Sequence, residues 1–146
     1  MKTGIVNFDH EIDPSLLPAH LAGCLRDVDA NAVQVRDNSV TFRGGFFRFV
    51  GSWNVLVPFG FGDLTVDSET CKVRYGLSYG QLVISFTIAI GVMAAVMLAL
   101  EGPQGILASM PTLALIWFLA VFVNLSIGFL RFKRFLRRSI ATAPCK

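Results

Sequence analysis

Two long uncharged stretches dominate the second half of the sequence. They cover residues 82–100 and 106–130. A helix of nineteen residues rises about 28 Å, close to the roughly 30 Å hydrocarbon core of a bilayer. A chain of 146 residues has no soluble core large enough to bury two such helices. The sequence therefore predicts two membrane-spanning helices.

The segment between the two stretches reads EGPQGILAS, residues 101–109. It is short, so the helices that it joins must be antiparallel neighbours. Pro111 fits the first turn of a helix for which Ser109 is the N-cap. We expect a hairpin over residues 81–130, with spans at about 82–100 and 110–130.

Positive charge is concentrated after the second stretch. Residues 1–80 hold seven Lys/Arg and nine Asp/Glu, whereas residues 81–146 hold six and one. The segment between the stretches has no Lys or Arg, so the positive-inside rule predicts that both termini are cytoplasmic. The absence of an N-terminal signal pattern and the three widely spaced cysteines agree with this orientation. We expect an integral protein of a bacterial cytoplasmic (inner) membrane.

The basic residues that follow the second stretch form one side of a predicted helix over residues 131–146. They are Arg131, Lys133, Arg134, Arg137 and Arg138. Phe132, Phe135, Leu136 and Ile140 fall on the opposite side at 100° per residue. The pattern predicts a short basic amphipathic helix that lies along anionic lipid headgroups. Nucleic-acid binding is disfavoured because the basic patch continues directly from a membrane span.

Small and polar residues recur every four positions in both spans. The first row is Thr87, Gly91, Ala95 and Ala99, and the second is Ala120, Asn124 and Gly128. Small residues at this spacing let helices approach closely in lipid. We expect the two rows to face each other, with a hydrogen bond between Asn124 and Thr87. The alternative is that Asn124 bonds its own helix backbone or a partner protein.

The first 80 residues predict a small α+β domain. Residues 1–30 hold an amphipathic helix that starts near Pro14, with Asp13 as its cap. Residues 31–80 show the period of two that is typical of strands, with turns near Asp37 and over residues 67–70. The prediction is an antiparallel meander of four or five strands, whose last strand enters the first span.

Aromatic and basic side chains alternate over residues 42–54. They are Phe42, Arg43, Phe46, Phe47, Arg48, Phe49 and Trp53. Such a mixture favours the headgroup zone of a membrane, so one interpretation is a loop at the membrane surface. The other interpretation is that these aromatics fill the core of the sheet.

The sequence shows no catalytic motif, no set of metal ligands and no cofactor fingerprint. The layout is similar to that of many small bacterial membrane proteins, and this similarity carries over no residue roles. We expect a non-enzymatic module that binds anionic lipid or a protein partner at the cytoplasmic leaflet. A subunit of a larger membrane complex is the alternative, and a membrane enzyme acting on lipid or peptide is less favoured. The oligomeric state stays open.

Overall fold

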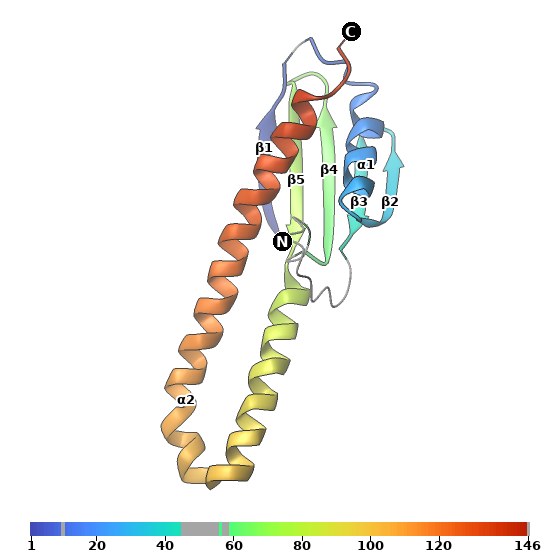
Figure 1. Cartoon of the computed structure of the whole chain (residues 1–146). Helices are drawn as coiled ribbons and strands as arrows, with labels where there is room; N and C mark the ends of the chain where they lie inside the picture. The colour runs from blue at the N-terminus through green and yellow to red at the C-terminus, as the bar shows by residue number, and fades with distance from the viewer. Residues whose placement is uncertain (10, 45–55, 57–58, 146) are drawn as a thin grey trace.

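The computed structural model describes residues 1–9, 11–44, 56 and 59–145. It is an α+β structure in which a five-stranded antiparallel sheet is joined to a long helical hairpin (Figure 1). The strands are β1 (Lys2–Asn7), β2 (Asn31–Arg36), β3 (Ser39–Arg43), β4 (Phe61–Asp67) and β5 (Lys72–Ser78). The helices are α1 (Leu17–Asp27) and α2 (Gly80–Ala141).

The sheet has the order β1-β5-β4-β3-β2. The predicted hairpin turns are confirmed: β2 pairs with β3 across Asp37, and β4 pairs with β5 across the turn after Asp67. Asp37 has a φ of 45°, a conformation that Asp tolerates in tight turns. Along β5 the side chains of Val73, Tyr75 and Leu77 are buried while Arg74 is exposed, as alternation predicts.

Strand β1 was not predicted. It adds to the free edge of β5, where Val6 lies opposite Val73 and Gly4 lies opposite Tyr75. A Cβ atom at Gly4 would come within 2.3 Å of the Tyr75 ring. Glycine therefore lets the aromatic ring lie flat across the edge strand.

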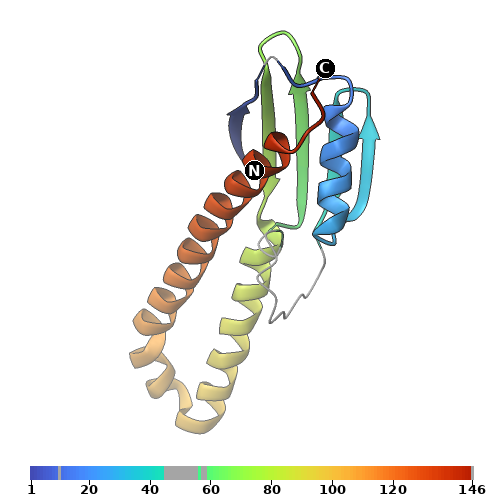
Figure 2. The same ribbon diagram turned by 45° about the horizontal axis from the view of Figure 1, so that its top comes forward.

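One face of the sheet is covered by two helices, and both views show them on the same side (Figures 1 and 2). Helix α1 contributes Leu17, Leu21 and Leu25 to the core. The C-terminal part of α2 contributes Phe132 and Leu136, both fully buried. The expected start of the first helix was wrong: α1 begins at Leu17, because Asp13 accepts hydrogen bonds from the backbone N–H and hydroxyl of Ser15 in a turn.

Helix α2 reverses direction at Gly102, which has a φ of 72° and a ψ of −174°. Glycine adopts this backbone conformation without the strain that a Cβ would cause. We call residues 80–101 the first arm and residues 103–141 the second arm. Pro103 opens the second arm, where its missing N–H costs little.

The predicted helix start near residue 110 was therefore wrong. Ser109 is not an N-cap, because its hydroxyl donates to the Gly105 carbonyl at 2.9 Å from within the helix. Pro111 also lies inside the helix. By length and composition, the stretches Gly80–Gly105 and Leu107–Ala141 could each cross a membrane.

Candidate functional site

The end of the second arm has two faces with different surroundings. Phe132, Leu136 and Ile140 are buried against the sheet, whereas Arg134 and Arg137 point to solvent. Phe132 packs on three rings of the sheet layer, with centroid distances of 6.0 Å to Phe42, 5.9 Å to Phe59 and 5.5 Å to Tyr75. This segment is amphipathic, as predicted.

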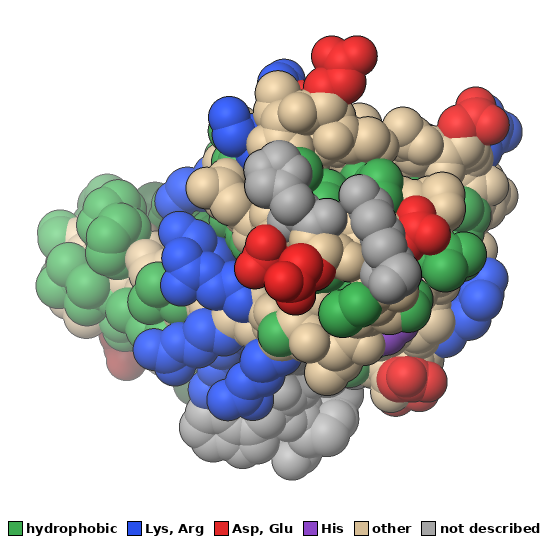
Figure 3. Space-filling view, turned by 90° about the horizontal axis from the view of Figure 1, so that it is seen from above, with side chains coloured by type: hydrophobic (Ala, Val, Ile, Leu, Met, Phe, Trp, Pro, Cys, Tyr) green, Lys and Arg blue, Asp and Glu red, His purple; other side chains and the backbone are tan. Residues whose placement is uncertain are grey.

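The predicted position of this helix was wrong in one respect. Its apolar face does not lie along a membrane surface, because the sheet covers it, and the helix is a continuation of the second arm rather than a separate element. Periodicity identifies an apolar face but not the surface that covers it. The basic face remains accessible: Arg134, Arg137 and Arg138 are exposed, and Arg131 and Lys133 are partly exposed. Figure 3 shows Lys and Arg side chains gathered on the side of the molecule from which the apolar hairpin extends.

The arms expose most of their apolar side chains. Ile84, Ile88 and Val92 of the first arm are each more than half exposed. None of the most apolar part of the first arm, and 17 % of that of the second, is buried. Nothing in the described part of the chain covers these side chains, so a lipid bilayer or another molecule must cover them.

The expected close contact between the two rows of small residues was wrong. A Cβ atom added at Gly91 would meet nothing within 4 Å, apart from its own helix. Gly91, Ala95 and Ala99 are exposed, while Gly128 is buried and Ala120 is partly buried. The three small residues of the first row are therefore open to the surroundings.

The expected bond between Thr87 and Asn124 is also absent. The Asn124 amide donates to the Ala120 carbonyl of its own helix at 2.8 Å, which was the alternative. Thr87 instead accepts a hydrogen bond from the Trp117 indole N–H at 3.1 Å. Thr87 lies fifteen residues before Gly102 and Trp117 fifteen residues after it, so the reversal at Gly102 places them opposite each other. This bond joins the two arms.

The aromatic stretch is only partly described. Phe42 is fully buried and belongs to the core, as one of the two interpretations expected, and Arg43 is exposed. The remaining members of the stretch, Phe46, Phe47, Arg48, Phe49 and Trp53, lie outside the described residues.

A hollow of about 590 Å³ lies where the sheet meets the first arm, and we call it the junction hollow. It forms at the end of β3, the start of β4 and the passage from β5 into α2. Its lining includes Arg43, Gly60, Phe61, Ser78, Gln81 and Ile84. The side chain of Gln81 packs directly over Gly60, where a Cβ atom would lie 2.5 Å from the amide oxygen. Among the described residues that line this hollow, Arg43 is the single charged one.

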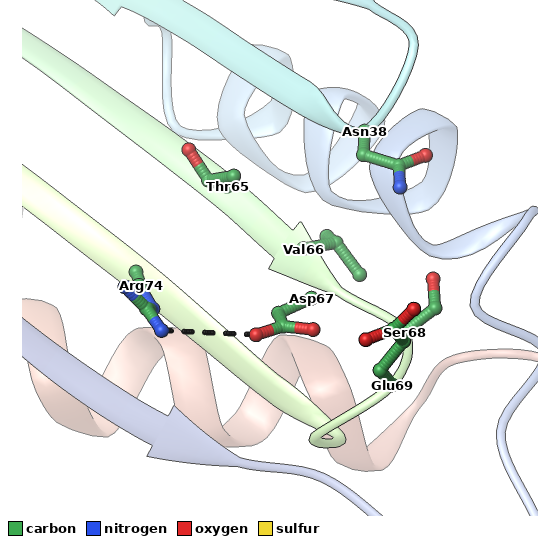
Figure 4. A pocket seen from close by; sticks show the side chains of 7 residues that line it. All are labelled: Asn38, Thr65, Val66, Asp67, Ser68, Glu69 and Arg74. Atoms are coloured by element: carbon green, nitrogen blue, oxygen red, sulfur yellow. Dashed lines mark ion pairs between the residues drawn. The ribbon is translucent and has the colours of Figure 1, made fainter.

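A second hollow of about 590 Å³, the distal hollow, lies at the other end of the sheet. Figure 4 shows its lining residues, with a dashed line for the ion pair of 3.8 Å between Arg74 and Asp67. Asp67 also accepts hydrogen bonds from the hydroxyl and backbone N–H of Thr70 at 2.7 and 3.3 Å. These bonds lower the pKa of Asp67, and Arg74 adds a smaller effect in the same direction. The interactions of Asp67 are those of a stable hairpin turn.

Two further groups have shifted pKa values. Burial raises the pKa of Asp63, which lies on the uncovered face of the sheet beside Gly76, while a backbone hydrogen bond opposes the shift. Burial also raises the pKa of Tyr75, and the positive charge of Arg137 partly offsets this. Asp63 and Tyr75 lie on opposite faces of the sheet, so they do not form a pair for acid–base catalysis.

His20 joins the two helices that cover the sheet. Its Nε2 atom lies 2.9 Å from the Ser139 carbonyl oxygen and 3.6 Å from the Cys24 sulfur. A carbonyl oxygen can only accept, so Nε2 carries the proton in this contact. The same nitrogen then has no free lone pair with which to deprotonate Cys24. The geometry is that of a structural contact between α1 and α2.

Within the described residues, no group of three or more His, Cys, Asp or Glu side chains is placed to hold a metal ion. Comparison of the chain with protein-family models, with curated proteins and with solved structures found no match.

Proposed function

We propose that this protein is a non-enzymatic binding module anchored in a cytoplasmic membrane, with the hairpin in the bilayer and the sheet at the cytoplasmic surface. The observation that carries the proposal is the second arm. It is exposed and apolar over most of its length, and then it enters the core of the sheet domain without a break. A helix of 35 residues rises about 52 Å, which exceeds the hydrocarbon core by several turns.

The length of the second arm supports a rigid attachment. Its apolar part lies in the bilayer, and its last turns lie above the membrane on the sheet. β5 meanwhile passes into the first arm after Ser78. The sheet domain is thus held at both ends of the hairpin. Such a domain presents its exposed surfaces at a fixed height and orientation relative to the headgroups, which suits binding of a partner at the leaflet.

The charge pattern supports the orientation. The turn around Gly102 has no Lys or Arg, and five basic residues lie where the second arm leaves its apolar segment. Near an anionic leaflet each basic residue contributes about 1 kcal/mol. We therefore propose that the sheet domain and both termini are cytoplasmic.

A subunit of a larger membrane complex is a second candidate. The exposure of Gly91, Ala95 and Ala99 favours it, because a row of small residues open to the surroundings can receive another helix. Purification in a mild detergent separates the two candidates. A complex subunit should elute with partner chains or as an oligomer, and Gly91→Leu should reduce the particle to one chain. A single chain in wild type would favour the module.

Labelling of single cysteines in sealed vesicles tests the membrane topology. One variant keeps Cys145 and replaces Cys24 and Cys71 with Ala. The other replaces all three with Ala and carries Gln104→Cys next to the turn. A membrane-impermeant maleimide should label Cys145 only in inside-out vesicles and position 104 only in right-side-out vesicles. Labelling of both positions from the same side would contradict the proposal.

A further inference from the structure

The junction hollow has the features of a lipid-binding site. It begins at an exposed cation, Arg43, and ends at Ile84, which is 57 % exposed. Ile88 and Val92 follow Ile84 at intervals of one helical turn and are also exposed. The hollow, with Arg43 at one end, thus continues directly into an apolar track on the first arm.

The charge of the junction hollow differs from that of the distal hollow. In the distal hollow, Arg74 is offset by Asp67 and Glu69. Among the described residues no carboxylate lies within ion-pair distance of the Arg43 guanidinium. Ser78 and Gln81 add a hydroxyl and an amide beside Arg43. A guanidinium flanked by neutral hydrogen-bond donors suits a phosphate group.

The depth of the hollow fits the headgroup layer if the hairpin spans the membrane as proposed. The first apolar stretch begins at residue 82, and the lining residues Ser78, Gln81 and Ile84 lie within about one helical turn of that position. We infer that the junction hollow binds the phosphate of an anionic phospholipid, with one acyl chain along Ile84, Ile88 and Val92. This inference rests on the proposed membrane insertion.

The experiment measures thermal unfolding of the full chain in detergent micelles during titration with phosphatidylglycerol. Phosphatidylcholine and glycerol phosphate are titrated in parallel. Phosphatidylglycerol should raise the unfolding temperature at concentrations where the other two do not. Arg43→Gln should weaken the apparent affinity for phosphatidylglycerol about fivefold, the equivalent of about 1 kcal/mol for one basic group. The matched control is Arg36→Gln, which removes an exposed arginine at the opposite end of the sheet.

A second pair of variants, in which an amide is replaced by a carboxylate of the same shape, makes the test independent of the stability of Arg43→Gln. Gln81→Glu places a negative charge inside the junction hollow and should weaken phosphatidylglycerol binding by at least the same factor. Asn38→Asp makes the same change in the distal hollow and should leave binding unchanged. Equal affinity of Gln81→Glu and wild type would overturn the inference. So would equal stabilisation by glycerol phosphate, which would indicate a site for free phosphate.

Alkaline extraction of membranes distinguishes failure of this inference from failure of the proposed function. Wild type and Arg43→Gln should both stay in the membrane fraction. If they stay and bind phosphatidylglycerol equally well, the lipid site is wrong and the membrane anchor stands. If the alkaline wash releases wild type, the proposed function and this inference both fail.

Discussion

The two ends of the second arm carry the same kinds of side chain in opposite environments. Phe122 is 58 % exposed, whereas Phe132, fewer than three turns further along the same helix, is fully buried. Hydropathy does not distinguish them, because both lie in apolar faces of one continuous helix. The difference lies in what is available to cover each face. The sheet covers the face with Phe132, and no described part of the sheet domain covers the face with Phe122.

This comparison predicts its largest effect at Phe132. Phe132→Ala removes a ring that contacts Phe42, Phe59 and Tyr75 and leaves a cavity in the core. The free energy of unfolding of the sheet domain should fall by about 3–5 kcal/mol. Phe122→Ala is the control and should change it by less than about 0.5 kcal/mol. Thermal and denaturant unfolding in detergent measures both. Equal losses would mean that the two ends are covered alike.

Two exposed valines test the same contrast through the amount of protein that enters the membrane. Val92 in the first arm is 60 % exposed, and Val35 on the outer strand of the sheet is 41 % exposed. Val92→Lys places a charge within a span, which costs about 2.5–3.5 kcal/mol on insertion scales. Val35→Lys adds a charge at a surface already in water. The amount of protein in the membrane fraction should fall for the first variant only, and a fall for both would break the comparison.

Two glycines should respond in opposite directions to the same substitution. A Cβ at Gly62 would lie 2.2 Å from the Phe42 ring, whereas a Cβ at Gly91 would meet nothing. Gly62→Ala should therefore destabilise the sheet domain by about 1–3 kcal/mol through overpacking. Gly91→Ala should be neutral or stabilising by up to about 1 kcal/mol, because Ala is the better helix former. Unfolding midpoints in detergent provide the measurement. Loss of stability in Gly91→Ala would indicate a close neighbour at that position.

The smallest predicted effect concerns Asp67 and pH. Hydrogen bonds from Thr70 lower the pKa of Asp67 in the folded state below its ordinary value near 3.8. The carboxylate therefore stabilises the fold above the unfolded-state pKa, and this contribution is lost as pH falls through the folded-state pKa. Asp67→Asn should lower the unfolding midpoint at pH 7. It should also reduce the fall in that midpoint when the pH is lowered from about 5 to 2. Glu69→Gln in the same turn is the control. A midpoint that rises in Asp67→Asn at pH 7 would contradict the assignment.

The sequence predicted the parts of the fold that depend on local pattern. The turns at Asp37 and after Asp67 and the two apolar stretches follow from residue types and periodicity. It did not predict β1, because Gly4 and the exposed Ile5 interrupt the alternation that marks a strand. The reversal at Gly102 lies within the predicted connecting segment, residues 101–109, but the start of the second helix was placed too late because Ser109 and Pro111 resemble a helix start.

Contacts between distant segments explain the remaining differences. The pattern of Phe132, Leu136 and Ile140 is the same whether lipid or a sheet covers it. The open space at Gly91 and the bond from Trp117 to Thr87 depend on how the two arms are placed and rotated, which spacing alone does not determine. For the candidate site, Arg43 was singled out by composition. Its position beside Ser78, Gln81 and Ile84 required the sheet register.

The depth of Trp117 tests most directly whether the hairpin lies in a bilayer. Trp117 is hydrogen-bonded to Thr87, which lies five residues after the apolar stretch of the first arm begins at residue 82, or about 7–8 Å inside the hydrocarbon region. In a Trp53→Phe variant it is the single tryptophan. Reconstituted in vesicles with lipids brominated at different depths, its fluorescence should be quenched by bromines on the acyl chains, most by those nearer the headgroups, and little by acrylamide in water. Strong quenching by acrylamide and none by brominated lipid would contradict the account.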